Sequence, residues 1–406
     1  MDPHTLQLEV QVGLLLAGLL VSLVACPLAI RLSRRLGILD RPAEGKIHRE
    51  PIPLLGGVAV FAAFYGVLLA GLAVGLLALG GRLGWTPPGR IAFYLQNIGG
   101  TGVLPRLGTI LLAGAGIFAL GLWDDLRRLP VWTRLLLQAA LAGAVVAAGV
   151  RPEFFGLPIA VVGPLVVLWI VGITNAMNLL DGADGEAAGV GAISTGLLVV
   201  AMARLDQPLV VALLMVLEGA LLGFLRFNFS PARIFLGSSG SMLIGYLLSV
   251  TVLEATFMRP GSANVLPVAM PILILGVPLY DTLGVMLIRL VSRRPLTARD
   301  TSHLQHRLMY LGMTQRQAVL LIYLFAFSLG INALVLVDLA VTDGLILLGQ
   351  VFCVVAMVAL LERAALRIIR IRTGVWREIS QEFVEAARRN LERRDEPPMP
   401  PSPGRA

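Results

Sequence analysis

Charged side chains are scarce in this chain. Only 14% of its 406 residues are Asp, Glu, Lys or Arg, whereas 57% are hydrophobic, and the mean hydropathy is +0.83. Soluble domains carry about 25% charged residues, so this composition excludes an ordinary soluble fold. We therefore expect a protein that crosses a membrane several times.

Cysteine and aromatic residues are also few. Cys26 and Cys353 are the only two cysteines. Both lie within apolar runs, so a disulfide framework is not expected and each is predicted to be a small buried side chain. Aromatic residues make up 6% of the chain. The sequence shows no aromatic-and-basic surface of the kind that binds nucleic acid, so nucleic acid is not expected as a partner. The formal charge of +8 instead indicates attraction of basic loops to anionic lipid head groups.

Long apolar runs occupy most of the chain. A helix needs about 20 apolar residues to cross a bilayer, and eleven runs approach or exceed that length. They cover residues 9–31, 54–80, 107–123, 132–150, 157–173, 187–203, 208–225, 239–257, 264–288, 317–338 and 343–362. The prediction is an all-α polytopic membrane protein with about eleven transmembrane helices, forming one domain over residues 1–362.

The basic residues predict the orientation. The first run has no basic segment before it and no small-residue cleavage site, and Arg31, Arg34 and Arg35 follow it. The positive-inside rule then puts the N-terminus outside and, after eleven spans, the C-terminus in the cytoplasm. Residues 363–394 are predicted to form a basic amphipathic helix on the inner membrane surface. The Pro-rich residues 395–406 are predicted to be disordered.

Polar motifs gather on that same cytoplasmic side. Five segments carry them: residues 45–57, 121–130, 172–190, 223–241 and 299–312. A site that acts on a cytosolic substrate at the bilayer surface needs such clustering, whereas a protein that only conducts or anchors does not. A transporter is disfavoured, because the sequence has no internal repeat and no inverted pair of broken spans.

Two amides and two carboxylates follow one another at intervals of three, as Asn175, Asn178, Asp181 and Asp184. On a helix they would spread over half the circumference, since each step of three residues turns back by about 60°. They can converge only if the helix tightens or unwinds, which Gly182 and Gly185 permit. The alternative is that "DGADG" is ordinary turn chemistry.

Asp124 and Asp125 form an adjacent carboxylate pair whose members point in different directions. One could bind a metal while the other acts as a base or supports the ligand. Oxygen ligands suit Mg²⁺ or Mn²⁺, and a hard divalent ion near a membrane suggests a phosphate substrate. The alternative is a solvated cap at a helix end.

Other polar residues allow two interpretations. His303 and His306 in "HLQH" could line a site or lie exposed on a basic loop, and Asn228 could simply end a helix. Lys46 is the only lysine in the chain. Inside predicted spans, where a charge is costly, we expect internal hydrogen bonds for three acidic residues. These are Glu218, Glu254 and Asp281, of which Asp281 is the strongest candidate for a functional role.

Taken together and in order, the motifs from about residue 37 to 312 resemble the polyprenyl-phosphate N-acetylhexosamine-1-phosphate transferases. This resemblance implies a prokaryotic inner-membrane enzyme with its active site on the cytoplasmic face. Such an enzyme transfers a sugar 1-phosphate from a UDP-sugar to undecaprenyl or another polyprenyl phosphate and releases UMP. It uses Mg²⁺, with Mn²⁺ as an alternative, and makes the first lipid-linked intermediate of a cell-envelope polysaccharide. Whether the chain forms a homodimer is left open.

The resemblance also implies residue roles. The catalytic residues would be Asp124, Asp125 and His303. The substrate would be bound by Lys46, His48, Asn175, Asp184, Asn228, His306 and Arg307. The metal would be held by Asp125, Asn178, Asp181 and Ser238.

Two positions depart from the family's motifs. The family has Leu-Gly-Asp-x-Gly-Ser where this chain reads "LGSSGS", so Ser238 replaces an expected metal-binding aspartate. Gln305 stands where the family often has a histidine. Two alternatives follow: the remaining carboxylates hold the ion, or turnover is reduced or lost and the protein binds lipid phosphate or nucleotide as a regulator.

Overall fold

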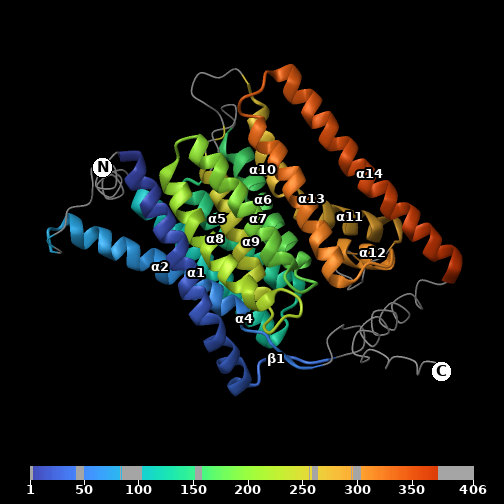
Figure 1. The fold of residues 1–406 in the computed structure, drawn as a ribbon, viewed down its shortest axis with the longest axis horizontal. Helices are drawn as coiled ribbons and strands as arrows, with labels where there is room; N and C mark the ends of the chain where they lie inside the picture. The colour runs from blue at the N-terminus through green and yellow to red at the C-terminus, as the bar shows by residue number, and fades with distance from the viewer. Residues whose placement is uncertain are drawn as a thin grey trace, which may run out of the picture.

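The computed structural model describes residues 3–42, 50–82, 84, 103–150, 158–255, 257, 264–293, 295 and 303–373. Its helices lie side by side in a bundle, with α14 along one edge (Figure 1). The longer helices are α1 (Pro3–Leu36), α2 (Gly56–Leu79), α4 (Val103–Arg127), α5 (Val131–Ala147), α6 (Ile159–Leu180), α7 (Glu186–Arg204), α8 (Pro208–Asn228), α9 (Gly237–Glu254), α11 (Gly276–Val291), α13 (Gln315–Val335) and α14 (Val341–Thr373). The shorter elements are β1 (Leu39–Asp40), β2 (Ile52–Pro53), η1 (Leu266–Ala269), α10 (Met270–Ile274) and α12 (Leu304–Tyr310).

Every predicted apolar run coincides with helix in the described residues. Among them, 8 helices are long and apolar enough to cross a membrane, and up to 9 if one bent pair counts as a span. The helix α5 is shorter, at 17 residues. The Gly- and Ser-containing α9 is buried along nearly its whole length, so its surroundings are protein and it need not be as apolar as a lipid-facing helix. The chain is a multi-pass membrane protein, and the count of eleven spans stays a prediction.

The run at residues 264–288 was predicted as one span and is bent. Its two halves, Leu266–Ile274 and Gly276–Val291, meet at 72°. Pro278 lies in the first turn of α11 and has no N–H to donate to the helix before it, which favours a break at this point. The bend directs α11 away from the bundle and towards α14 (Figure 1).

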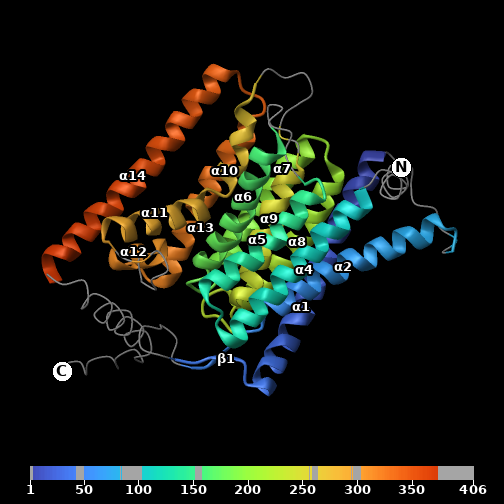
Figure 2. The same cartoon turned by 180° about the vertical axis from the view of Figure 1, so that it is seen from behind.

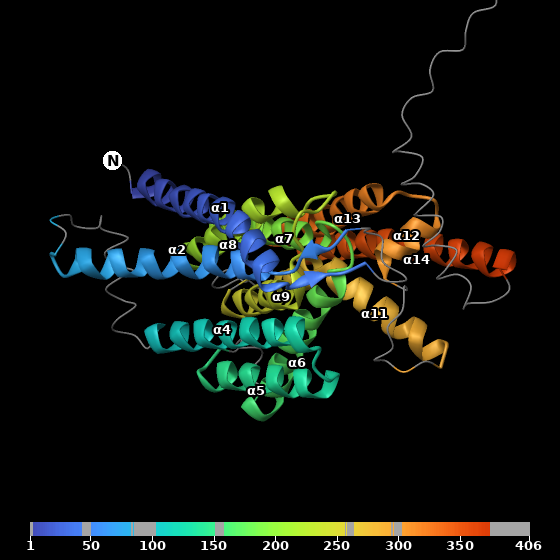
Figure 3. The same ribbon diagram turned by 90° about the horizontal axis from the view of Figure 1, so that it is seen from below.

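The buried helix α9 lies between α2 and α4, as the view from below shows (Figure 3). Two glycines allow this close approach. A Cβ at Gly121 of α4 would lie 2.6 Å from the backbone oxygen of Ser238, and a Cβ at Gly57 of α2 would overlap the backbone of Gly240. Backbone contacts on both sides therefore fix the position at which α9 begins.

The described parts of the predicted polar segments lie at one end of the bundle. Here α1, α4, α6 and α8 end and α2, α7, α9 and α13 begin (Figures 1 and 2). The strands β1 and β2 pair at this end too, antiparallel, with Leu39 opposite Pro53. Chain segments that are far apart in the sequence thus meet on one face, as the clustering of motifs predicts.

Some local expectations need correction. Cys26 is buried as predicted, but Cys353 is exposed on α14. Glu254 forms the expected internal contact, an ion pair with Arg106 at 2.7 Å, whereas the buried Oε2 of Glu218 has no hydrogen-bond partner among the described residues. The helix α14 continues without interruption to Thr373. Residues 374–394 of the predicted amphipathic helix and the predicted tail 395–406 lie outside the described residues.

The orientation can be tested with a reporter protein that is active only outside the cytoplasm. We expect no reporter activity when it is fused after residue 394, because the arginine distribution puts the C-terminus inside. A matched fusion after Gly84 should be active, because this residue follows the second predicted span and so lies outside in the predicted topology. Activity at residue 394 would reverse the topology and place the polar end of the bundle outside.

Candidate active site

The loop between α6 and α7 carries the amides and carboxylates that occur at intervals of three. Asn175 and Asn178 lie on the last turns of α6, and Asp181 ends that helix. Gly185 adopts a φ of 79° before α7 begins, a left-handed conformation that favours glycine. The helix therefore unwinds where the two glycines of "DGADG" occur, and this prediction is confirmed.

Asp125 and Asp181 meet at the N-terminus of α9. The Asp125 carboxylate accepts the N–H of Ser238 at 2.7 Å and that of Ser239 at 3.0 Å, and Asp181 accepts the N–H of Gly237. The first N–H groups of a helix lack intrahelical partners and attract negative charge. The start of α9 thus holds together two carboxylates that lie far apart in the sequence.

The proximity of these carboxylates alters the acidity of Asp181. Burial, followed by the negative charge of Asp125, raises the pKa of Asp181 to about 8. Two like charges that share a partly buried site disfavour the ionised form. A cation between them would remove this repulsion.

Asp124 has a different environment from its neighbour. Its carboxylate accepts the Leu129 N–H at 2.8 Å, the Ser238 hydroxyl at 3.0 Å and the Arg134 guanidinium at 3.2 Å. Asp124 and Asp125 both contact Ser238, so the prediction that they point in different directions is not confirmed; they differ in that Asp124 also binds Leu129 and Arg134. Arg134 was not predicted from the sequence, although a charge within the apolar run at 132–150 was a signal for it.

Each amide of α6 contacts a neighbouring helix. Asn175 donates to the Gln138 side chain of α5, which is fully buried, and Asn178 donates to the Ser241 hydroxyl of α9 at 2.9 Å. Because Nδ2 of Asn178 makes this bond, its Oδ1 is oriented away from Ser241. These two hydrogen bonds thus fix the last turns of α6 relative to α5 and α9, next to Asp125 and Asp181.

Asn228 and Asp184 join the loop after α6 to the one after α8. The buried Asn228 accepts the Gly185 N–H at 3.1 Å and donates to the Ile234 carbonyl at 2.9 Å. Asp184 accepts the Ala232 N–H at 3.0 Å. These contacts assign Asn228 a role in fixing the two loops, and its predicted contact with a nucleotide stays a prediction.

The oxygen atoms at this end suit a magnesium ion. Among the described residues no group of three or more His, Cys, Asp and Glu side chains could hold a metal. Magnesium, however, is often bound by one or two carboxylates with substrate phosphates and water completing the shell. Asp125 and Asp181 fit that pattern, with the Asn178 amide and the Ser238 hydroxyl as neutral neighbours. The donor set therefore fits Mg²⁺ bound together with a phosphate substrate.

His303 is held by a buried carboxylate that connects it to other elements. Its Nδ1 lies 2.8 Å from Oδ2 of Asp281, and Oδ1 of Asp281 accepts the Leu304 N–H at 2.6 Å and the Arg307 guanidinium at 3.1 Å. Asp281 is 1% exposed. The expectation of internal hydrogen bonds for Asp281 is confirmed, and its partners include two of the predicted site residues.

Residues 303–310, which comprise His303 and helix α12 and are called the histidine segment below, touch the loop after α6 through Gln305. This side chain is buried and lies so close to Gly182 that a Cβ at position 182 would overlap its amide nitrogen and force the Gln305 side chain to move. His306 lies one residue further along α12. The predicted residues Lys46 and His48 lie outside the described residues.

Glu186 was not predicted from the sequence. It is fully buried next to the loop after α6, and neither of its carboxylate oxygens has a hydrogen-bond partner among the described residues.

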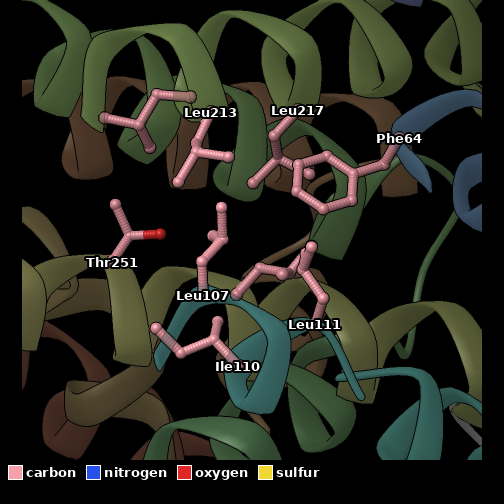
Figure 4. Close-up of a pocket in the computed structure, with 9 residues that line it drawn as sticks. Phe64, Leu107, Ile110, Leu111, Leu213, Leu217 and Thr251 are labelled. Carbon is pink, nitrogen blue, oxygen red and sulfur yellow. The ribbon is translucent and has the colours of Figure 1, made fainter. Parts of the chain in front are cut away.

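A separate cavity lies between α2, α4, α8 and α9, towards the end of the bundle opposite the carboxylates (Figure 4). It is lined by residues of α2, α4, α8 and α9, including Phe64, Leu107, Leu217 and Thr251. The Thr251 hydroxyl is the polar group among otherwise apolar side chains. Because Leu107 and Thr251 lie near the ends of α4 and α9 remote from Asp125 and Ser238, this cavity is not the candidate active site.

Comparison with known proteins identifies the family. The model of glycosyl transferase family 4 matches residues 107–256. A probable undecaprenyl-phosphate N-acetylglucosaminyl 1-phosphate transferase from Bacillus subtilis is 34% identical over 79% of this chain and 83% of its own length. The chain belongs to glycosyl transferase family 4. The resemblance to polyprenyl-phosphate N-acetylhexosamine-1-phosphate transferases is thereby confirmed.

Two further relatives of this family 4 chain extend the comparison. A decaprenyl-phosphate N-acetylglucosaminephosphotransferase from Mycobacterium tuberculosis is 31% identical over 72% of this chain and 74% of its own length. An undecaprenyl-phosphate alpha-N-acetylglucosaminyl 1-phosphate transferase from Escherichia coli is 25% identical over 73% and 76%. The matched segment 107–256 contains Asp124, Asp125, the loop after α6 and the start of α9. The roles of single residues stay predictions.

Proposed function

We propose that this family 4 enzyme transfers N-acetylglucosamine 1-phosphate from UDP-N-acetylglucosamine to a polyprenyl phosphate. An oxygen of the lipid phosphate bonds to the β-phosphorus of the nucleotide sugar. The bond from that phosphorus to the bridging oxygen breaks, and UMP leaves. This phosphoryl transfer requires no change of oxidation state and no further reactant. The relatives' names, which specify both a polyprenyl phosphate and N-acetylglucosamine, support this choice of substrates.

The observation that carries the proposal is the meeting of Asp125 and Asp181 at the start of α9. Two carboxylates held together at helix ends repel each other unless a cation lies between them. The phosphate oxygens of a diphosphate can complete the coordination of that cation. When bound, Mg²⁺ would neutralise charge that develops on the diphosphate. The contribution of the chain is mainly to position and neutralise the reacting groups.

The other residues are assigned roles by their contacts. Asp124 is held by Arg134 and the Ser238 hydroxyl, so it lies beside the metal-binding carboxylates as a fixed charge or a proton acceptor. His303, oriented by Asp281, presents its second ring nitrogen from the histidine segment. We assign it to the diphosphate or sugar side of the site, across the loop that Gln305 contacts.

The membrane determines where the acceptor binds. A polyprenyl phosphate keeps its tail in lipid, so its head group must reach Asp124 and Asp125 at the ends of membrane helices. We place this end of the bundle at the cytoplasmic face of a bacterial plasma membrane, where a UDP-sugar is available. The product would be the first lipid-linked sugar of a cell-envelope polymer.

The proposal can be tested with purified protein, undecaprenyl phosphate and a panel of UDP-sugars. We expect UMP release that requires the lipid and a divalent cation, with UDP-N-acetylglucosamine the best donor. Release of UDP in place of UMP would indicate a different bond cleavage. Absence of any nucleotide product with every donor would contradict the proposed activity.

A further inference from the structure

The histidine segment is connected to the last membrane helix by a chain of buried polar contacts. Asp281 of α11 binds both His303 and Arg307, at 2.8 and 3.1 Å. The Arg307 guanidinium then reaches Glu362 of α14 at 2.7 Å, and the Tyr280 hydroxyl donates to the same carboxylate oxygen at 2.9 Å. The chain of contacts runs over three helices; its charged members are buried, with Asp281 1%, Arg307 5% and Glu362 3% exposed, and Tyr280 is partly buried.

The helix α14 otherwise has little buried contact with the bundle. Among its residues 341–363, only Gly344, Val351 and Glu362 are buried, and it lies along the outer edge of the structure (Figures 1 and 3). Ile346 and Phe352 on its outer side are more than two thirds exposed, whereas Leu347, Val351 and Val354 pack against the core. In a bilayer such side chains give no hydrophobic drive for association with other helices. Glu362 is thus the polar contact that specifies where this end of α14 docks.

The geometry also shows what Glu362 does for Arg307. The guanidinium is held from both sides, by Asp281 through Nη2 and by Glu362 through Nη1, and it lies over the Tyr280 ring at 5.8 Å. Removal of one partner from a buried ion pair leaves an uncompensated charge. Without Glu362, Arg307 would shift towards Asp281, which also orients His303.

We infer that Glu362 is a positioning residue, through which α14 fixes the histidine segment by way of Arg307 and Asp281. This role was not apparent from the sequence, where Glu362 is the last residue of an apolar run. It gives the last membrane helix a part in the active site without contact with substrate. The consequence for turnover rests on the proposed function, whereas the consequence for the histidine segment does not.

The test is Glu362→Gln in the full-length protein, which removes the charge and retains the shape. Leu361→Gln is the matched control, since it adds the same amide on a neighbouring side chain that is 60% exposed. We measure kcat and KM for the UDP-sugar, and the rate at which diethyl pyrocarbonate modifies His303, by peptide mass spectrometry. His4, which is not assigned to the site, serves as the internal reference for the reagent.

For Glu362→Gln we expect kcat to fall about tenfold. This is the lower end of the loss seen when a residue that orients a functional side chain, without contacting the substrate, is replaced. KM should change little, and His303 modification should rise severalfold while the modification of His4 is unaffected. Rates at His303 equal to those of Leu361→Gln would overturn the inference. So would faster modification with an unchanged kcat, because the contact would then be structural only.

Two further outcomes are separable. If Glu362→Gln does not fold, Tyr280→Phe removes one hydroxyl from the same carboxylate and should raise His303 modification to a smaller extent; no increase would overturn the inference. If the wild-type protein has no transferase activity, the proposed function fails, and the modification rates alone decide whether α14 fixes the histidine segment.

Discussion

Replacement of either carboxylate at the start of α9 is expected to abolish turnover. Asp125→Asn and Asp181→Asn should each lower kcat/KM by roughly a thousandfold or more, since metal stabilisation of transition-state charge is worth several kcal/mol. Both side chains keep an oxygen that can accept from the N–H groups of Gly237 to Ser239. The variants should therefore fold, with a cost of about 1–3 kcal/mol if one N–H of α9 is left without a partner.

The measurement is steady-state turnover at saturating Mg²⁺, with thermal unfolding recorded on the same preparations. Asp343→Asn is the matched control, because it makes the same chemical change at an exposed position in the first turn of α14. It should retain wild-type activity. Near-normal product from Asp125→Asn or Asp181→Asn would remove that residue from the metal site.

Restoring a carboxylate at position 238 is expected to strengthen metal binding. The Ser238 hydroxyl donates to Asp124 and its N–H donates to Asp125, so Ser238→Asp adds a fourth acidic side chain to Asp124, Asp125 and Asp181 at the start of α9. A full negative charge in place of a neutral hydroxyl attracts Mg²⁺ more strongly. We expect about tenfold less Mg²⁺ to be needed for half-maximal activity, equivalent to about 1.4 kcal/mol of binding free energy.

The control for charge is Ser238→Asn, which has nearly the same size as the aspartate and should not lower the Mg²⁺ requirement. In the absence of metal, Ser238→Asp should be less thermally stable than wild type because its new charge faces Asp124 and Asp125. Added Mg²⁺ should reverse that difference. A higher Mg²⁺ requirement in Ser238→Asp would mean that the natural site has reorganised around Asp125, Asp181 and Asn178.

The sequence predicted the helices well because membrane spans are long and uniformly apolar. It also predicted that the loop at Asp181 must unwind, since helical geometry would otherwise separate side chains at intervals of three. The bend between α10 and α11 was missed, because the apolar run is continuous through residue 275 and its prolines alone did not decide between a kink and a break.

Contacts between distant segments were less predictable. The resemblance assigned His303 and Arg307 to the site, but neither spacing nor composition paired them with Asp281 and Glu362, which lie on other helices. Arg134 and Gln138 occur four residues apart within one apolar run, and that polar pair was a signal for a contact with the site. The roles of Lys46 and His48 stay predictions, since both lie outside the described residues.

The central claim is that the sugar leaves its nucleotide together with one phosphate. UDP-N-acetylglucosamine labelled separately with ³²P at its α- or β-phosphorus tests this directly in a reaction with undecaprenyl phosphate and Mg²⁺. Our account predicts that the β label enters the organic phase as a lipid-linked diphosphate sugar, while the α label remains in water as UMP. Retention of both labels in the aqueous phase, or release of both as UDP, would contradict it.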